Sequence, residues 1–462
     1  MREAQPAESS PITAALAEFI VETGIGHLPA AVVDASKALW LDSLGVTIAG
    51  AVEPVGRAIA EHVREQGGSG QSVLIGQGLR SSPALAALAN GTMAHALDYD
   101  DISLTWLGHP SAVLLPAVLA LGTQLRASGA QTIAAYVVGW EVGAAVGRSI
   151  RHQIHESGWH STSVTGTVAA AAACANLAGL DVAQTRTALG IAASLAAGMY
   201  ANRGTDTKPL HAGNAARGGL LATDLALKGL DASPNLFDGP GNFCQTLIGE
   251  DCDEGKMLTE LGKGWDIVRP GATVKLHACC GASHYCLDAL FGLLNDHSLV
   301  AAEVAEIECH VPPGMPEVLI HSRPTTGLEA KFSLEYALAA ALLDGRAGIA
   351  QFTDEAVLRP EAQELLRRVH YFHPAGMENS TREIVAQPHR VVVRLHSGER
   401  REAECRFFRG RPENPLSREE LVGKFHDCAG RILDHSRRKK VLDLVDRLDA
   451  LEDLADLNAV LT

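Results

Sequence analysis

The spacing of apolar residues predicts one helix after another from about residue 11 to residue 267. Val55, Ile59 and Val63 recur every four residues and indicate one face of an amphipathic helix. A short strand is expected at 73–75, after the glycine-rich loop 67–70. Three further segments are apolar on almost all sides, which is typical of helices at the centre of a bundle: 111–122, 163–179 and 186–198.

After Pro270 the pattern changes to a mixture of strands and helices. Ile307, Cys309 and Val311 alternate with polar residues and predict a strand, which ends at two prolines. A second alternation at 391–395, a Ser-Gly turn at 397–398 and a charged strand up to Phe408 predict a hairpin. Helices are expected between these strands, at 328–344 and 354–369.

The last part of the chain returns to helices. Ser417, followed three residues later by Glu420, is typical of a capping box at a helix start. Leu444, Leu448 and Leu451 are expected on one face of the final helix, and the basic run 437–440 is interpreted as a solvated helix face.

These patterns predict a mainly α fold, and 462 residues are too many for one ordinary core. We expect a large all-helical domain with an inserted, smaller α+β lid domain, and a cleft between the two. The predicted boundaries are residues 1–268 for the first part of the helical domain, 269–408 for the lid, and 409–462 for the helices that pack back on the helical domain.

Composition narrows the kinds of partner. Hydrophobic residues make up 47% of the chain and aromatic residues only 5%, so Ala, Leu and Val supply the core, which favours closely packed helices. The net charge of −15 argues against nucleic acid and anionic membranes as partners.

The sequence also indicates where the protein is located. No apolar run is long enough to cross a bilayer, and the first residues lack the pattern of a signal peptide. The nine cysteines contain no CxxC pair, so we expect a cytoplasmic protein with reduced thiols.

A polar island lies inside the otherwise apolar stretch 91–122. It contains His95, Asp98, Asp100 and Asp101, and His109 follows at the start of an apolar helix. Desolvating a charge costs several kcal/mol unless it is paired, so this cluster indicates a site for acid–base chemistry. The same residues could bind Mg²⁺ or a non-haem metal, but they lack EF-hand or HExxH spacing, and we place metal binding second. We expect one aspartate to orient a histidine or lysine and another to be structural.

Three basic residues precede helices in a similar way. His109 and His160 each stand directly before an apolar helix, and Lys208 precedes Pro209 at the start of a helix that continues to Leu220. Helix N-termini attract anions, so three of them together predict a receptor for a di- or tricarboxylate. The same dipoles disfavour imidazolium and leave neutral histidine available as a base. The alternative is that each histidine only caps its own helix.

The lid begins with a second polar group, Lys275, His277, Cys279, Cys280 and His284. One interpretation is a lysine that closes on a substrate carboxylate; the other is an exposed lysine beside a buried thiol pair. Nothing in the sequence indicates a thiol nucleophile. The absence of GxGxxG, P-loop and GxSxG motifs leaves nucleotide binding and serine hydrolysis without support.

Several motifs along nearly the whole chain resemble the MmgE/PrpD family. They are NGTMAHALDYDD with GHPSAVLLPA, GWHSTSVTG, GTDTKPLHAGNAARGG, KFSLEYALAAALLDG and NPLSREELVGKFHDCA. The resemblance implies a cofactor-independent enzyme with no metal, a helical domain with an α+β lid, and a homodimer. It also implies a catalytic set and a substrate-binding set. The catalytic residues are Asp98, His109, His160, Lys208 and Lys275, and the substrate-binding residues are His284, Cys280 and His95.

The activity implied is that of a lyase on a small di- or tricarboxylate, similar to 2-methylcitrate dehydratase or cis-aconitate decarboxylase. A proton would move at a carbon α to a carboxylate, with loss of water or CO₂. The alternative is an epimerase of an aminodicarboxylate such as iminodisuccinate, through the same carbanion. Where the decarboxylase carries polar residues, this chain has Ile102, Cys280 and Ile320, which indicates a substrate with a different third substituent. A carboxylate-binding protein without catalytic activity is a further possibility.

Overall fold

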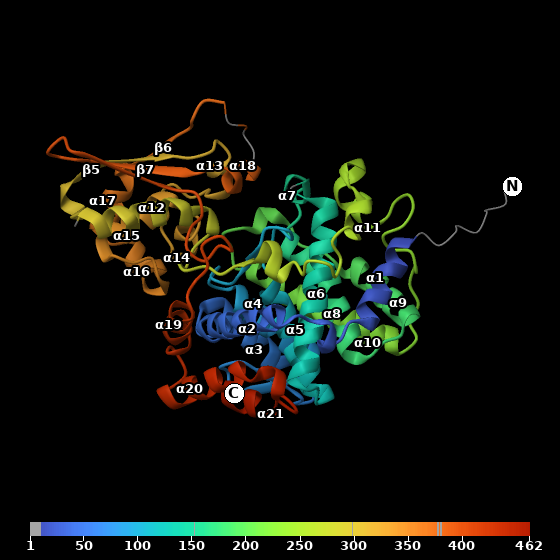
Figure 1. Cartoon of the computed structure of the whole chain (residues 1–462). Helices are drawn as coiled ribbons and strands as arrows, with labels where there is room; N and C mark the ends of the chain where they lie inside the picture. Colours follow the sequence, from blue (N-terminus) through green and yellow to red (C-terminus); the bar gives the residue numbers. More distant parts are fainter. Residues whose placement is uncertain (1–10, 152, 298, 377, 379–380) are drawn as a thin grey trace.

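The computed structural model describes residues 11–462, except 152, 298, 377 and 379–380. Most of the described chain is helical, and a small sheet lies at one end of the molecule (Figure 1). The mainly α fold with a smaller α+β part is therefore confirmed. The longer helices of the first part are α1 (Pro11–Glu22), α2 (Ala30–Gly50), α3 (Pro54–Gln66), α4 (Pro83–His95), α5 (Pro110–Leu125), α6 (Gly129–Ile150), α8 (Ser161–Ala178), α9 (Val182–Leu195) and α10 (Thr207–Leu227).

Local sequence sets where these helices begin and end. Pro110 occupies the first turn of α5, where a missing N–H costs nothing. Ser128 accepts a hydrogen bond from the Gln131 N–H and forms a capping box at the start of α6. Gly179 ends α8 with a φ of +67°, a conformation that glycine adopts without a Cβ penalty.

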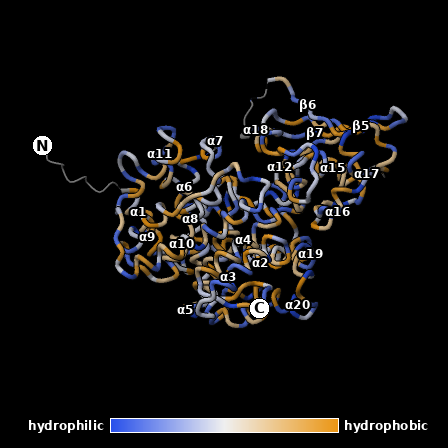
Figure 2. The backbone as a smooth tube through the Cα atoms, turned by 180° about the vertical axis from the view of Figure 1, so that it is seen from behind, coloured by the Kyte–Doolittle hydropathy of each residue, from blue (hydrophilic) through white to orange (hydrophobic). Residues whose placement is uncertain are grey.

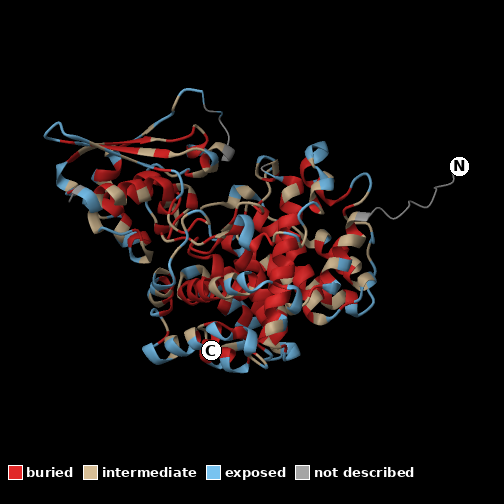
Figure 3. Cartoon of the chain, in the orientation of Figure 1, coloured by how far each residue is buried: buried red, intermediate tan, exposed pale blue. Residues whose placement is uncertain are grey.

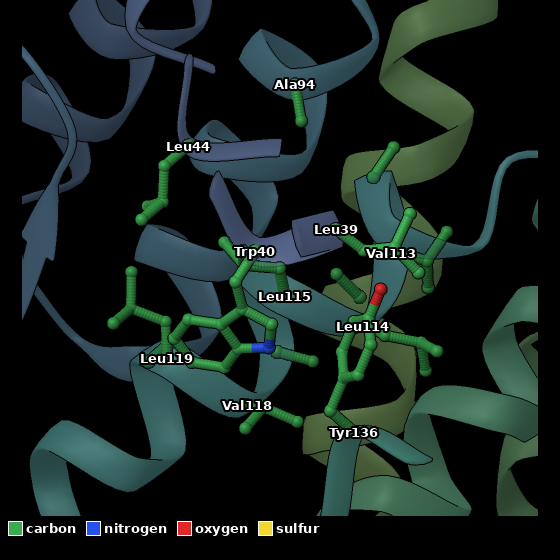
Figure 4. Packing of buried hydrophobic residues seen from close by; sticks show 14 of the residues in the cluster. Leu39, Trp40, Leu44, Ala94, Val113, Leu114, Leu115, Val118, Leu119 and Tyr136 are labelled. Carbon is green, nitrogen blue, oxygen red and sulfur yellow. The ribbon is translucent and has the colours of Figure 1, made fainter. Parts of the chain in front are cut away.

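The core of the helical part forms around α5 and α8, whose residues are almost all buried (Figure 3). Apolar segments gather in the interior of this part, as the hydropathy colouring shows (Figure 2). Trp40 of α2 meets Tyr136 of α6 edge to face, with ring centroids 6.2 Å apart, beside leucines and valines of α5 (Figure 4). The expected central position of 111–122 and 163–179 is therefore confirmed. The third segment, 186–198, is only half buried, because one side of α9 faces solvent.

Two glycines allow α4 and α10 to pack unusually close. A Cβ on Gly91 would lie 2.7 Å from the Cα of Gly213, and a Cβ on Gly213 would lie 2.1 Å from the carbonyl oxygen of Leu88. The C-terminal end of α4 carries His95, and the first turn of α10 carries Lys208. The close approach of the two helices therefore brings these two side chains together.

Gly213→Ala is expected to force α10 away from α4, because its new Cβ meets backbone atoms that cannot rotate away. Overpacking of this kind costs about 1–3 kcal/mol, so the midpoint of thermal unfolding should fall together with activity. Gly218→Ala is the matched control on the same helix, since its Cβ meets only side-chain atoms, the Thr167 Cγ2 at 3.1 Å and the Leu195 Cβ at 3.8 Å. Equal unfolding midpoints for the two variants would contradict this account of the packing.

Short strands hold the loops around the helical part. Strands β1 (Ser72–Leu74) and β2 (Leu79–Ser81) form an antiparallel pair, which confirms the short strand expected near 73–75. Strands β3 (Ile102–Ser103) and β4 (Ala272–Thr273) pair with Ile102 opposite Thr273. This second pair ties the loop after α4 to the segment that carries Lys275, two residues beyond β4.

The α+β part contains a four-stranded sheet with helices on one side (Figure 1). The strands lie in the order β6 (Val369–Phe372), β5 (Val304–His310), β7 (His389–Leu395) and β8 (Arg400–Cys405). β5 runs parallel to β6 and antiparallel to β7. Ile307 and Cys309 of β5 and Val391 and Val393 of β7 are buried, and β7 pairs with β8 as a hairpin, so the predicted strand and hairpin are confirmed. The second strand of the hairpin ends at Cys405, not at Phe408 as predicted.

The helices of this part are α12 (Gly281–His297), α13 (Met315–Val318), α14 (Gly327–Ala330), α15 (Leu334–Asp344), α16 (Asp354–Val357), α17 (Pro360–Leu365) and α18 (Thr381–Ala386). Two of the predicted helices are shorter than expected. The segment 328–344 is interrupted before Ser333, whose side chain caps α15. The segment 354–369 breaks at Pro360, which lacks the N–H needed to continue a helix, and ends as the first residue of β6.

The C-terminal segment packs against the helical part. Its helices are α19 (Arg418–Ala429), α20 (His435–Asp446) and α21 (Ala455–Leu461), and Ser417 forms the predicted capping box. A buried ion pair of 2.7 Å between Lys424 and Asp42 joins α19 to α2. The expected single final helix is wrong: α20 ends before Leu448, which lies in a separate turn. The domain boundaries at 268 and 408 stay a prediction.

Among the described residues, no single helix is both long and apolar enough to cross a membrane; α2 and α3 pass such a test only as a pair bent by 84°. All nine cysteines lie in the described part of the chain and are free thiols.

Candidate active site

The loop between α4 and α5 places the polar island in a strained, tightly held conformation. Asp98 has a φ of +49°, in the left-handed region that a residue with a Cβ seldom adopts. Three consecutive backbone carbonyls of the loop each accept a hydrogen bond from a buried lysine. The pairs are Lys331 with Leu97 (3.0 Å), Lys275 with Asp98 (2.6 Å) and Lys424 with Tyr99 (2.8 Å). These lysines come from the α+β part and the C-terminal segment, so distant parts of the chain fix this loop together.

The carboxylate of Asp98 binds two ammonium groups. Lys208 donates to its Oδ1 over 2.5 Å, and Lys275 lies 3.1 Å from its Oδ2. Burial opposes ionisation of Asp98, but the two lysines outweigh it and hold the pKa of the carboxyl well below its usual range. Burial likewise opposes the charge of Lys275, whose pKa is nevertheless raised by Asp98 and Asp100. Asp98 and Lys275 are therefore ionised at neutral pH, and Lys208 binds the same carboxylate.

Asp100 orients two histidines, as expected for one of the aspartates. The Nδ1 of His95 lies 2.9 Å from Asp100 Oδ2 and donates to it, since the Nε2 of His95 accepts from Lys208 over 2.8 Å. The Nδ1 of His109 lies 3.2 Å from the same oxygen. Burial, reinforced by the lysines and opposed by Asp100, lowers the pKa of His95 to about 4 and also lowers that of His109.

The neutral state of His95 predicts a dependence of stability on pH. The pKa of His95 falls from 6.5 to about 4 on folding, so its contribution to stability is fully present above pH 6.5 and is lost as the pH falls towards 4. The free energy of unfolding in urea should therefore fall less between pH 7 and pH 5 for His95→Gln than for the wild type. Identical changes for the two proteins would contradict a neutral His95.

His160 lies at the start of α8, and its Nδ1 is 3.1 Å from the Nδ1 of His211 on α10. Burial and then the charge of Lys208 hold the pKa of His160 well below its ordinary value. The sequence attributed neutral histidines to helix dipoles; in the structure burial is the largest cause. The starts of α5 and α8 adjoin each other, because the His109 N–H donates to Thr162 Oγ1 over 3.2 Å.

Asp101 has a structural role, as expected for another of the aspartates. Its Oδ1 accepts from the backbone N–H of Ser111 over 3.1 Å, and its Oδ2 accepts from the Ser111 hydroxyl, which contacts Tyr136. Burial raises the pKa of Asp101 to about 8. The carboxyl group is therefore mostly protonated at pH 7 and binds the first turn of α5.

A cavity of about 200 Å³ opens beside these groups. All five predicted catalytic residues lie on its wall: Asp98, His109, His160, Lys208 and Lys275. Lys208 is in the first turn of α10, which begins at Thr207 and continues to Leu227, not Leu220 as predicted. The structure therefore brings together three helix starts and the lysine of the α+β part.

The three predicted substrate-binding residues have different positions. Cys280 lies on the cavity wall, and burial raises the pKa of its thiol. His95 lies behind Lys208 and does not line the cavity. His284 does not line the cavity: its ring is fully buried against Phe408, and its substrate-binding role stays a prediction. α12 begins at Gly281 and turns this histidine into the core of the α+β part.

Sequence reasoning did not single out several residues on the wall or behind it. Arg203 and Arg411 line the cavity, and Tyr200 packs under Arg203, with the guanidinium carbon 4.7 Å from the ring centroid. Lys331 and Lys424 hold the loop from behind. Both lysines lie inside motifs that carry the family resemblance, and this position was the signal in the sequence that could have identified them. Arg203 directly precedes another of these motifs.

Lys331 tests the role of the lysines behind the loop. It is buried, and burial lowers its pKa to about 8. Lys331→Met replaces a costly buried cation with an apolar side chain of similar length, so the unfolding midpoint should change little. The loss of the bond to the Leu97 carbonyl frees the loop, and kcat is expected to fall about tenfold, the equivalent of one hydrogen bond, with little change in KM. An unchanged kcat would contradict a role in positioning Asp98.

One group of residues also has the composition of a metal site. Ligand atoms of His95, Asp98, Asp100 and His109 lie within 4.8 Å of one another. The ammonium groups of Lys208 and Lys275 already bind both oxygens of Asp98. A divalent cation among these atoms would be repelled by both lysines, so the arrangement fits an anionic ligand better than a metal.

Fold and site together define a class of protein: a mainly helical enzyme with an α+β part, whose buried Asp–Lys–His cluster faces a small cavity. The chain belongs to the MmgE/PrpD family. The family's N-terminal domain matches residues 14–254 and its C-terminal domain residues 277–450. Both matches together cover most of the chain and place it among enzymes of the lyase type.

Its relatives include proteins named cis-aconitate decarboxylase. Those of Mus musculus and Homo sapiens are each 30% identical to this chain, over 97% of its length and 93% and 94% of theirs. The cis-aconitate decarboxylase of Aspergillus terreus is 29% identical, over 97% of this chain and 95% of its own. The similarity thus extends over essentially the full length of both partners in each comparison.

Proposed function

We propose that this protein is a cofactor-independent lyase that removes CO₂ or water from a small carboxylate. The observation that carries the proposal is the cluster of Asp98, Lys208 and Lys275 beside two neutral histidines on one cavity wall. Ammonium groups in a buried cavity bind carboxylates strongly, and a neutral imidazole accepts or relays a proton near pH 7. The names of the relatives agree with a reaction of this kind.

Each group has a distinct part in the proposed reaction. Lys208 and Lys275 bind a substrate carboxylate and stabilise the negative charge that spreads into it when the neighbouring carbon becomes a carbanion. His109 or His160 moves the proton at that carbon. A bound polyanion raises the pKa of a nearby histidine, so the same ring that is neutral in the free protein can donate a proton once substrate is present. Asp98 binds both lysines and holds them in place.

An epimerase is the second candidate, and one observation favours it. His109 and His160 both line the cavity, and burial keeps both neutral. One neutral histidine can remove a proton from one face, and the other can return a proton to the opposite face once bound carboxylate has raised its pKa and it has become protonated. This alternative uses the same carbanion and the same lysines, and it differs only in releasing neither CO₂ nor water.

The test is to incubate the protein with cis-aconitate, 2-methylcitrate, citrate and an aminodicarboxylate and to follow products by NMR. Loss of CO₂ or water from any of them supports the lyase, and deuterium exchange without elimination supports the epimerase. The measurement is repeated after exhaustive chelation, and activity is expected to persist. If no carboxylate in the series reacts or exchanges, the proposal is wrong.

A further inference from the structure

Part of the cavity wall is apolar, although the other part is a cluster of charges. Its apolar side chains include Ile102, Leu104, Leu107, Val318, Ile384 and Phe408. They come from β3 and the loop after it, from α13, from α18 and from the segment after β8. Ile320, which the sequence placed at the site, is 40% exposed and does not line the cavity; Val318 lines it instead.

The apolar wall begins directly beside the lysine that binds Asp98. A Cβ placed on Gly281 would lie 2.7 Å from the Ile102 Cδ1 and 3.9 Å from the Lys275 Cε, so isoleucine and lysine flank the same glycine. The adjacent wall residue, Cys280, is an uncharged thiol, because burial raises its pKa. A carboxylate at this point would lose its hydration, and the two side chains would offer it only the weak S–H donor of Cys280.

The cavity wall has too few free cations to bind a substrate with three carboxylates. The two ammonium groups of Lys208 and Lys275 are shared with Asp98. Arg411 is paired with Glu413 at 2.9 Å. Arg203 is different: its Nη2 donates to a backbone carbonyl, and its Nε has no hydrogen-bond partner among the described residues. Arg203 therefore leaves one cation available in addition to the lysine cluster.

We propose that the substrate is a dicarboxylate with an apolar substituent, which occupies the place of a third carboxylate. The two carboxylates bind the lysine cluster and Arg203, and the substituent packs on Ile102, Val318 and Phe408. This inference rests on the proposed function, since it names the substrate class of the same site.

Four ligands that share a maleate core test the inference: maleate, 2-methylmaleate, 2-isobutylmaleate and cis-aconitate. The last two have nearly the same shape, because the isobutyl group replaces CH₂–COO⁻ with CH₂–CH(CH₃)₂. Affinities are measured by calorimetry on the full chain, and turnover by NMR. Each buried methyl or methylene is worth about fourfold in affinity, so 2-isobutylmaleate should bind at least tenfold more tightly than cis-aconitate.

A variant with one polar group on the apolar wall gives the matched comparison. Ile102→Thr keeps a branched side chain and adds a hydroxyl beside Lys275. It should reduce the preference for 2-isobutylmaleate over cis-aconitate by at least threefold. Val318→Thr is the second variant, and unfolding midpoints are measured for both to confirm that they fold.

The results distinguish the proposed substrate class from the proposed function. A preference for 2-isobutylmaleate that Ile102→Thr or Val318→Thr reduces supports the inference. Equal or tighter binding of cis-aconitate overturns the inference and leaves the proposed function standing. If none of the four ligands binds and the carboxylate series of the preceding section gives no reaction, the proposed function fails, and the substrate class fails with it.

Discussion

Asp98→Asn is expected to reduce kcat/KM by about a thousandfold or more, equivalent to about 4 kcal/mol of transition-state stabilisation. The carboxylate lies 2.5 Å from the Lys208 Nζ and 3.1 Å from the Lys275 Nζ. Without it, two buried ammonium groups repel each other and lose their shared counter-charge. Removing one partner of a buried ion pair costs about 3–5 kcal/mol, so the unfolding midpoint should fall as well.

Asp101→Asn is the matched control, three residues away in the same loop. Burial raises the pKa of Asp101 to about 8, so its carboxyl group is already mostly uncharged at pH 7. An uncharged amide is therefore a closer substitute for the Asp101 carboxyl group than for the ionised carboxylate of Asp98. Activity should change only a few-fold. Comparable losses in the two variants would mean that the loop needs both side chains for structure and that Asp98 has no special role.

Replacing either cavity histidine is the second change with a large expected effect. His109→Gln and His160→Gln should each lower kcat by about 10²–10⁴-fold if the ring moves the proton, since general acid–base catalysis contributes that much. Glutamine keeps a polar side chain of similar reach, so the fold should persist. Steady-state kinetics at pH 7 and unfolding midpoints are measured on the same preparations.

The control is His277→Gln in the same fold, since His277 pairs with Asp288 at 3.1 Å and does not line the cavity. Its kcat should remain within a few-fold of the wild type. If one cavity histidine can be replaced without loss, the other is the proton carrier. If neither replacement lowers kcat, proton transfer by these histidines is excluded.

The sequence predicted the architecture well where hydrophobic period and local capping decide the outcome. The apolar run of α5 and α8, the capping box of Ser417 and the alternation of Ile307 and Cys309 in β5 each depend on residues close in the chain. The prediction was wrong where one residue or turn interrupts a helix, as at Pro360 and at the end of α20 before Leu448.

The site was predictable in part, for a similar reason. His109 and His160 could be found because each stands at a helix start, and Asp98 because charges are rare beside a buried helix. The lysines that bind the loop carbonyls could not be assigned from the sequence, because their partners are far away in the chain. Lys331 and Lys424 lie 234 and 325 residues from the carbonyls that they bind. The buried position of His284 was not predictable, because the sequence does not show which face of α12 packs inward.

The central claim is that this cluster moves a proton at a carbon next to a carboxylate. The most direct measurement follows deuterium from D₂O into that carbon, in the product or in recovered substrate, by NMR and mass spectrometry. The wild type is expected to incorporate carbon-bound deuterium, and Asp98→Asn at least a thousandfold more slowly. Loss of CO₂ without deuterium at that carbon, or incorporation at an equal rate by the two proteins, would contradict the account.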